Sequence, residues 1–254
     1  MARYRTNGSL DASFGSGGEA LADFGSGVSA TAAGVAIAPG GKIVVAGSIT
    51  DPTTFNNDFA VARFNVGGSL DTSFGSGGEA TASFGPNTSD TAAGVAVQAD
   101  GKIVVVGTDQ DFDTNFIDEF GLARFNANGS LDATFGSGGL VATSFGPSAS
   151  AFAAGLAIQP DGQIVVTGTV QDFTTDVISE FGLARYNTNG SLDASFGSGG
   201  LVTTSFGSGT SASAAGVAIG SDGEIIVAGT ITDSNFESNF TLAGYDGTKR
   251  KDRK

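Results

Sequence analysis

Four segments of the sequence gather side-chain oxygens that could bind a metal ion. They read SITDPTTFNNDFA (48–60), TDQDFDTNFIDEFG (108–121), TVQDFTTDVISEFG (169–182) and TITDSNFESNFT (230–241). In each, an Asp stands four residues after a Gly, and a polar side chain precedes a Phe. Carboxylates and amides without His or Cys favour a hard cation such as calcium. The candidate ligands are Asp51, Asp58, Asp109, Asp111, Asp113, Asn115, Glu119, Asp172, Asp176, Glu180, Asp233 and Asn235.

The second segment is the most ligand-rich. Its residues from Asp109 to Asn115 alternate as the first ligands of an EF-hand loop do. The likeness ends at Thr114, where that loop needs Gly, and at Phe120, where it needs Glu. Calcium is therefore a candidate cofactor. The other interpretation is that these segments are solvated loops in which Asp residues form turns.

The residue types argue against catalysis. The chain has no Cys and no His, so it lacks a thiolate nucleophile and an imidazole base. Two carboxylates can hydrolyse a glycoside, but the acidic residues recur in every segment, and no lone Tyr, Glu or Lys breaks the pattern. We therefore expect a protein that is not an enzyme, with carboxylate-based glycan hydrolysis as the third possibility.

Binding is the function that remains. Phe112, Phe116, Phe173 and Phe236 lie in the acidic segments and could stack on sugar rings. The sequence thus predicts a binding or scaffold module with an unidentified protein or glycan ligand. A calcium-dependent carbohydrate-binding module is the alternative.

The acidic segments belong to a longer repeat. Phe14, Phe74, Phe135 and Phe196 stand 60, 61 and 61 residues apart, each within a copy of NGSLDASFGSGG. A second phrase, AAGVAIAPGGKIVVAG at 32–47, returns three times at the same spacing. The triplet ARY at 2–4 is repeated at 62–64, 123–125 and 184–186, with a degraded copy, AGY, at 243–245. The chain therefore contains four repeats and a terminal fragment.

Each repeat predicts four short strands. Examples from different repeats are 122–125 for the first strand, 201–206 for the second, and 153–158 and 164–168 for the hairpin of the third and fourth. The hairpin turn contains Asp161-Gly162, whose residues tolerate the positive φ that such a turn needs. Repeats of this length with four strands are typical of β-propeller blades. The Ala-Ala-Gly segments would crowd near the propeller axis, while the Ile-Val-Val strands and Phe residues would pack between blades.

The predicted fold class is an all-β propeller of four antiparallel blades over residues 1–245. Residues 240–245 could replace or join the strand at 2–4 and so close the ring. An open arc, or two chains that pair into a larger ring, are the alternatives. The chain is thus expected to be a monomer or a self-associating ring.

ARYN, NGSLDASFGSGG and KIVVAG together resemble the delta-60 repeats of bacterial β-propeller-like proteins. The resemblance covers residues 2–245. It implies a propeller fold and a secreted or cell-surface location, and it carries no catalytic residues. The chain departs from the pattern at 243–254, where AGYDGTKRKDRK loses the Arg of the triplet.

An Arg and an Asp keep a constant spacing in every repeat. Asp11, Asp71, Asp132 and Asp193 each follow the Arg of the triplet by eight residues. The spacing predicts a repeated Arg–Asp pair across a turn, or an Asp that caps a turn. An inward ring of charges is the functional alternative.

The net charge of −14 argues against nucleic acid as a partner. No apolar run is long enough to span a membrane, and MARYRTNGSL contains no apolar core of a signal peptide. Residues 246–254 form a basic tail that we expect to be disordered.

Overall fold

The computed structural model describes residues 1–112, 117–174 and 178–247. These form fifteen strands and one short 3-10 turn, η1 (Pro39–Gly41). The strands are β1 (Ser29–Ile37), β2 (Ile43–Thr50), β3 (Asn57–Phe64), β4 (Glu79–Ala82), β5 (Thr88–Val97), β6 (Ile103–Asp111), β7 (Asp118–Phe125), β8 (Leu140–Thr143), β9 (Ala149–Ile158), β10 (Ile164–Asp172), β11 (Ile178–Tyr186), β12 (Leu201–Thr204), β13 (Ser211–Ile219), β14 (Ile225–Thr232) and β15 (Ser238–Tyr245).

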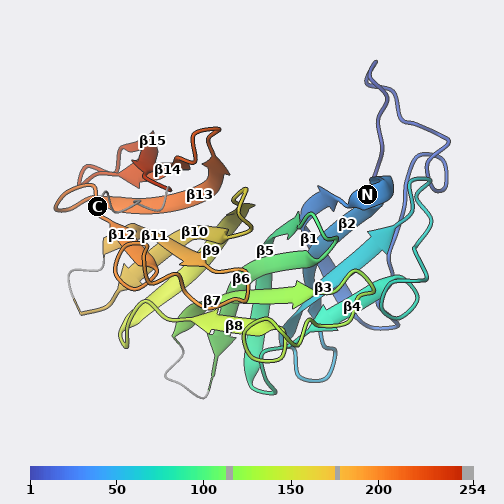
Figure 1. The fold of residues 1–254 in the computed structure, drawn as a ribbon, viewed down its shortest axis with the longest axis horizontal. Coiled ribbons are helices and arrows are strands. Elements are labelled where there is room, and N and C mark those ends of the chain that lie inside the picture. The colour runs from blue at the N-terminus through green and yellow to red at the C-terminus, as the bar shows by residue number, and fades with distance from the viewer. Residues whose placement is uncertain (113–116, 175–177, 248–254) are drawn as a thin grey trace, which may run out of the picture.

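The strands form four antiparallel sheets arranged as propeller blades (Figure 1). Three sheets have four strands, in the orders β1-β2-β3-β4, β5-β6-β7-β8 and β9-β10-β11-β12. The fourth has the order β13-β14-β15. The predicted all-β propeller is therefore confirmed. The predicted hairpin is also present: Gly162 has φ of +86°, and the Gln163 amide donates to the Asp161 carboxylate at 3.1 Å.

Small residues let the first strands of successive blades approach one another. A Cβ added to Gly155 of β9 would lie 3.6 Å from the Cα of Gly216 in β13. Gly94 of β5 similarly faces Leu156 of β9. The Ala-Ala-Gly segments thus line the inner edges of the blades, as the sequence predicts.

Each blade packs on the next through a phenylalanine ring and a glycine. Phe59 of the first blade lies against Gly107 of the second, where an added Cβ would come within 2.8 Å of its ring. Phe120 meets Gly168 and Phe181 meets Gly229 in the same way. A second ring packs edge-on against each of these, such as Phe84 against Phe59 at 5.5 Å. These ring pairs occupy the cores between blades.

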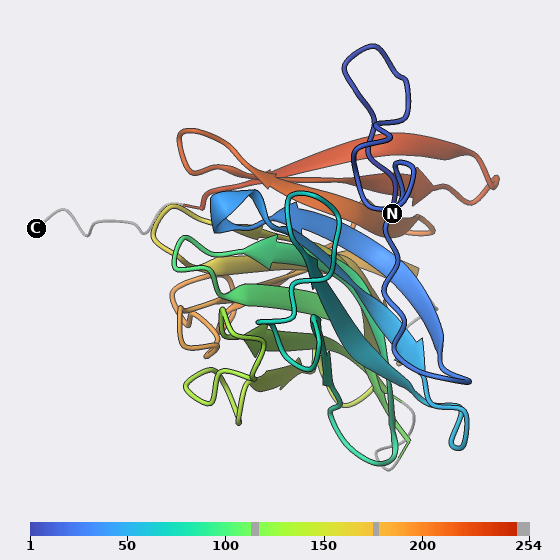
Figure 2. The ribbon, with the colours of Figure 1, turned by 90° about the vertical axis from the view of Figure 1, so that its right-hand side faces the viewer.

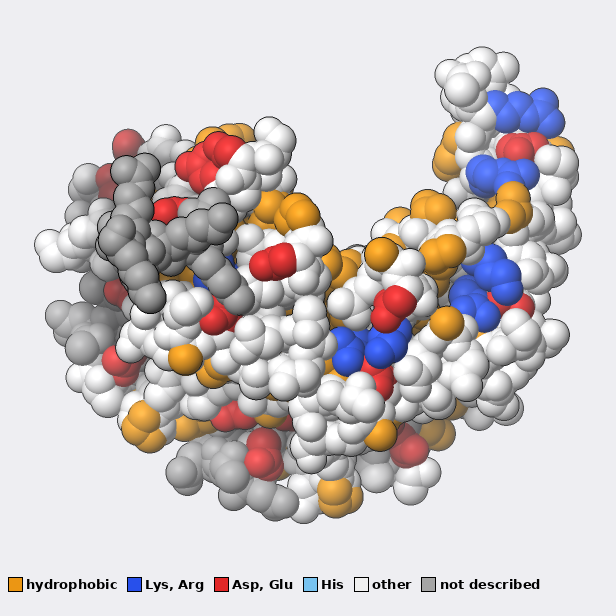
Figure 3. All heavy atoms as spheres, in the orientation of Figure 1, with side chains coloured by type: hydrophobic (Ala, Val, Ile, Leu, Met, Phe, Trp, Pro, Cys, Tyr) orange, Lys and Arg blue, Asp and Glu red, His pale blue; other side chains and the backbone are white. Residues whose placement is uncertain are grey.

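The four blades form an open arc. Figures 1 and 3 show a wide gap between the fourth blade and the N-terminal end, with hydrophobic side chains along the open side. Residues 240–245 pair with β14 and do not join residues 2–4, so the open arc, one of the predicted alternatives, is the arrangement found. Ala2 and Tyr4 instead form bridges with Glu19 and Leu10.

The last repeat, which opens with the triplet at 184–186, contributes four strands, β11 to β14, as predicted. The last sheet has three strands because its third, β15, is the terminal fragment that ends in AGY, and no copy of NGSLDASFGSGG follows it. Within the described residues, no helix is long and apolar enough to cross a membrane. Most of the predicted tail, 248–254, lies outside the described residues.

Candidate functional site

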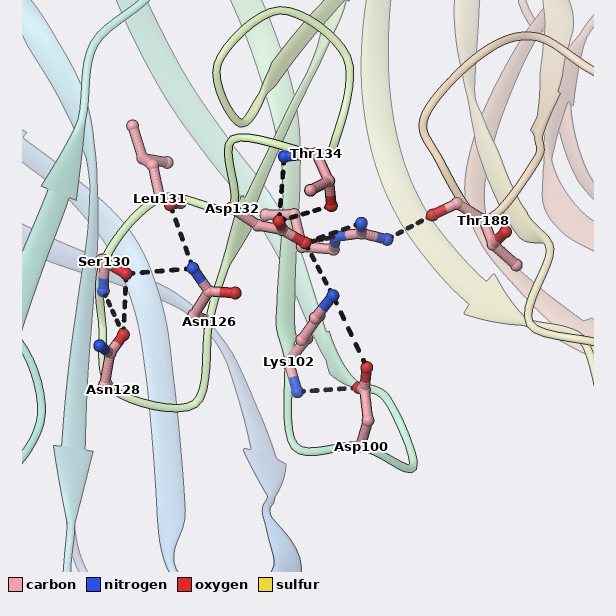
Figure 4. A network of polar contacts seen from close by, with 10 residues as sticks. Asp100, Lys102, Asn126, Asn128, Ser130, Leu131, Asp132, Thr134 and Thr188 are labelled. Carbon is pink, nitrogen blue, oxygen red and sulfur yellow. Dashed lines mark hydrogen bonds and ion pairs between the residues drawn. The ribbon is translucent and has the colours of Figure 1, made fainter.

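The predicted Arg–Asp pairs form between the blades, where they join neighbouring repeats (Figure 4). The Arg124 Nε donates to Asp132 at 2.8 Å, and the guanidinium lies 4.3 Å from the centre of the Phe135 ring. The same guanidinium donates to the carbonyl of Thr188 in the next repeat. Lys102 lies 3.0 Å from Asp132. The equivalent pairs are Arg3–Asp11, Arg63–Asp71 and Arg185–Asp193.

The aspartates of these pairs also cap turns, as the alternative interpretation predicts. Asp132 accepts the Thr134 amide at 3.1 Å and the Thr134 hydroxyl at 2.7 Å. Burial would raise the pKa of Asp132, but the bonds from Thr134, Lys102 and Arg124 hold that pKa well below its usual range. This carboxylate is therefore fully occupied by its neighbours.

Three of the four repeated loop aspartates head tight turns. Asp51 accepts the amides of Thr53 and Thr54, and Asp172 accepts the amide of Thr174. Asp233 accepts the amides of Asn235 and Glu237. Backbone donors lower the pKa of Asp51 and Asp233, and the Thr174 hydroxyl and amide lower the pKa of Asp172.

The remaining candidate ligands do not share this geometry. Asp58 and Glu180 lie half-buried in β3 and β11, and Asn235 is exposed. Asp113, Asn115 and Asp176 lie outside the described residues.

The second blade brings carboxylates into a row. In the antiparallel register, Asp109 of β6 lies opposite Asp90 of β5 on one side and Glu119 of β7 on the other. We call Asp90, Asp109 and Glu119 the carboxylate row. Asp111 lies at the end of β6, opposite Thr88, and Asp118 pairs with Gln110 at 3.0 Å.

Two members of the carboxylate row are buried side by side. Asp90 and Asp109 are hydrogen-bonded to each other, and the Phe84 amide donates to Asp90 at 3.0 Å. One buried Oδ1 atom of each has no hydrogen-bond partner. Burial, together with the neighbouring Asp109, raises the pKa of Asp90 to about 8. Burial also raises the pKa of Asp109 and of Glu119.

The sequence reasoning missed Asp90. The three equivalent positions hold Ala30, Ala151 and Ala212. Asp90 therefore breaks the symmetry of the repeats, although the search for a lone Tyr, Glu or Lys found nothing. The signal was an acidic residue inside the Ala-Ala-Gly strand, where the other repeats are apolar. Over the residues that the structure describes, no group of three or more Asp or Glu side chains is placed to hold a metal ion.

The ends of β2, β6, β10 and β14, near which the repeated aspartates stand, lie on one side of the molecule (Figure 2). We call the described residues at these ends, 51–56, 111–112, 172–174 and 233–237, the loop edge. Phe55, Phe173 and Phe236 lie on it with exposed fractions of 77%, 54% and 89%. Phe55 and Phe236 have φ of 61° and 64°. Large side chains rarely adopt this left-handed conformation.

The structural comparison finds a gluconolactonase from Xanthomonas campestris, at 14% identity and a TM-score of 0.34. The match covers 86% of this chain and 76% of that one. It corrects the expectation that the chain is not an enzyme, because the similar protein is one. A likeness this distant assigns no reaction to the chain.

A search of curated proteins finds no match. The family model described as "Domain of unknown function (DUF5122) beta-propeller" matches residues 1–14, 39–74, 98–135 and 159–196. These segments contain the four Arg–Asp pairs and three of the four hairpin turns. The chain is therefore a β-propeller repeat protein, and parts of its repeats are similar to a β-propeller family of unknown function.

Proposed function

We propose that the chain is a binding module that engages its ligand through the loop edge. The observation that carries this proposal is the pair of exposed, left-handed phenylalanines, Phe55 and Phe236. The left-handed conformation costs an L-residue roughly 1–2 kcal/mol. These exposed rings gain little burial to offset that cost. Strain of this kind concentrates at functional sites.

The loop edge offers two kinds of contact to a ligand. The rings of Phe55, Phe173 and Phe236 supply apolar surface, and the turns around Asp51, Asp172 and Asp233 surround them with polar groups. An apolar contact within a polar surround is the arrangement found in protein interfaces and sugar-binding sites. The supporting blades are rigidly packed, so the loops can carry the specificity.

The test replaces Phe55, Phe173 and Phe236 together with Asn, which tolerates positive φ. We expect the variant to lose binding to a printed glycan array or to a displayed peptide library. Its free energy of unfolding should stay unchanged or rise by up to about 1 kcal/mol, because the strain is relieved. Val66→Asn, at an exposed residue between β3 and β4, is the control and should bind as the native protein does. Equal binding by the triple variant, or no binding by the native protein, would contradict the proposal.

A second candidate function is calcium-dependent carbohydrate binding. It is favoured by the unpartnered Oδ1 atoms of Asp90 and Asp109, which a cation would satisfy. Calcium takes six to eight oxygen ligands, so water or the sugar itself would supply the others. The secreted or cell-surface location that we propose from the repeat resemblance would expose the site to extracellular calcium. Extracellular calcium modules bind with dissociation constants of roughly 10⁻⁴–10⁻³ M.

Calorimetric titration with calcium at pH 8.5 tests this candidate, because Asp90 has then released most of its proton. We expect binding, and a gain of about 2.7 kcal/mol in the free energy of unfolding at a hundredfold excess over the dissociation constant. The matched control is Asp90→Ala with Asp109→Val, which gives the second blade the residues of the third. A flat titration of the native protein, or equal heats from the control, would rule calcium out.

A further inference from the structure

The Phe–Gly contact between neighbouring blades leaves a Phe without a glycine partner at one end of the arc and a glycine without a Phe partner at the other. Phe59, Phe120 and Phe181 are fully buried, each against a glycine of the next blade. Their equivalent in the last blade, Phe240, is 99% exposed. Their glycine partners are Gly107, Gly168 and Gly229, and the equivalent in the first blade is Gly47. The three atoms nearest to a Cβ added at Gly47 belong to Thr31 and Ala32. At Gly107, Gly168 and Gly229, the three nearest atoms include those of a Phe ring.

The first blade contains a cavity at that place. It has a volume of about 280 Å³ and is lined by Gly47, Thr31, Ala60 and Phe24, among others. Phe24 is the equivalent of Phe84, Phe145 and Phe206. Each of those rings packs edge-on against a buried Phe from the third strand of its blade. The N-terminal end therefore presents the second ring of the pair and a space beside it.

The sheet edges fit the same contact. In the first blade, Phe59 and Ala60 of β3 pair with Ala82 and Thr81 of β4. In the repeat, Phe240 and Thr241 of β15 correspond to Phe59 and Ala60. Ala22 and Leu21, near the N-terminus, correspond to Ala82 and Thr81. β15 is the outer strand of its three-stranded sheet. Residues 19–22 therefore correspond to the fourth strand that this sheet does not have.

The triplet at the two ends of the chain also favours this contact. Gly244 of β15 stands where the other repeats have an Arg, and nearby Glu224 occupies the position of Lys42 and Lys102 in the first two blades. Arg3, at the N-terminal end, is 34% exposed and pairs with Asp11. The edge of β15 therefore lacks the Arg–Asp pair that the N-terminal end of a second copy carries.

We propose that two copies of this chain associate head to tail, with Phe240 of one copy in the Gly47 cavity of the other. The contact continues the interface that the chain already uses three times between its own blades. A second copy is the occupant because the ends of one molecule stand apart across the open side of the arc (Figures 1 and 3). Leu242–Tyr245 and Met1–Tyr4 occupy equivalent strand positions, so one of these segments gives way on docking. Such a head-to-tail contact produces a closed ring of copies if the rotation between neighbouring copies closes, and an open filament if it does not.

Sedimentation over a range of concentrations tests the association. We expect the native protein to exceed its monomer mass of 25.1 kDa as the concentration rises. Phe240→Ser should raise the dissociation constant roughly 30-fold or more, as the loss of a buried interface anchor does. Phe236→Ser removes an equally exposed ring from the loop edge, and its self-association should match that of the native protein. A native protein that stays monomeric, or equal effects of the two variants, would overturn the proposal.

Cross-linking separates pairing from closure within one molecule, because the chain has no Cys of its own. Leu21→Cys and Thr241→Cys are made as two separate proteins, which are mixed and oxidised. We expect a cross-linked species of twice the monomer mass. A monomer that cross-links only when both substitutions lie in one chain would mean that the arc closes on itself, and would overturn pairing.

Discussion

Replacing Asp90 with Ala and Asp109 with Val is expected to stabilise the protein by about 1–4 kcal/mol at pH 8. This is the range found when buried charged groups give way to apolar residues of suitable size. The second blade would then match the third, which holds Ala151 and Val170 at these positions. The substitution removes two buried carboxyls and their unpartnered Oδ1 atoms. Urea denaturation of the native and substituted proteins measures the difference.

The gain should depend on pH in a defined direction. The pKa of Asp90 is about 8 in the folded protein, above the ordinary value of 3.8. The folded state therefore keeps a proton that the unfolded state releases. The stabilisation from this proton is complete below about pH 4 and is lost as the pH rises through 8, at up to about 1.4 kcal/mol per pH unit. The native protein should lose more stability between pH 5 and 8 than the variant does. Parallel pH curves for the two proteins would contradict this.

Arg124→Ala is expected to cost about 3–5 kcal/mol. The Arg124 side chain is 5% exposed, and its removal leaves the buried Asp132 carboxylate without its main partner. It also removes the bond to the Thr188 carbonyl, which ties the second and third blades together. The expected result is a large drop in the urea midpoint, with Lys102 compensating only part of the charge of Asp132.

The matched control is Arg3→Ala, which removes the same pair where it is partly exposed. The Arg3 side chain is 34% exposed and lies 2.8 Å from Asp11. An exposed ion pair contributes about 0–1 kcal/mol, so the control should cost less than Arg124→Ala. Similar losses in the two variants would mean that burial does not decide the strength of this pair.

The blades could be predicted from the sequence because their signals are local and repeated. The Asp161-Gly162 turn and the Arg124–Asp132 spacing each lie within a few residues, and four copies reinforce them. The sequence left a closed ring and an open arc as alternatives, because closure depends on the small rotation between blades, which no single phrase encodes. The carboxylate row was only partly found. Asp109 and Glu119 lie in a segment already singled out by its acidity, whereas Asp90 lies opposite them in another strand.

The phenylalanine-in-glycine contact has a consequence for how such chains change in length. Because every blade presents the same ring to its neighbour and receives it in the same way, no blade is specific to its place in the order. A gene duplication or deletion that spans one whole repeat would leave a working contact at the junction. Stability then grows with the number of neighbouring pairs. The Phe–Gly contact thus allows evolution to lengthen or shorten the arc by recombination alone, without inventing a new surface.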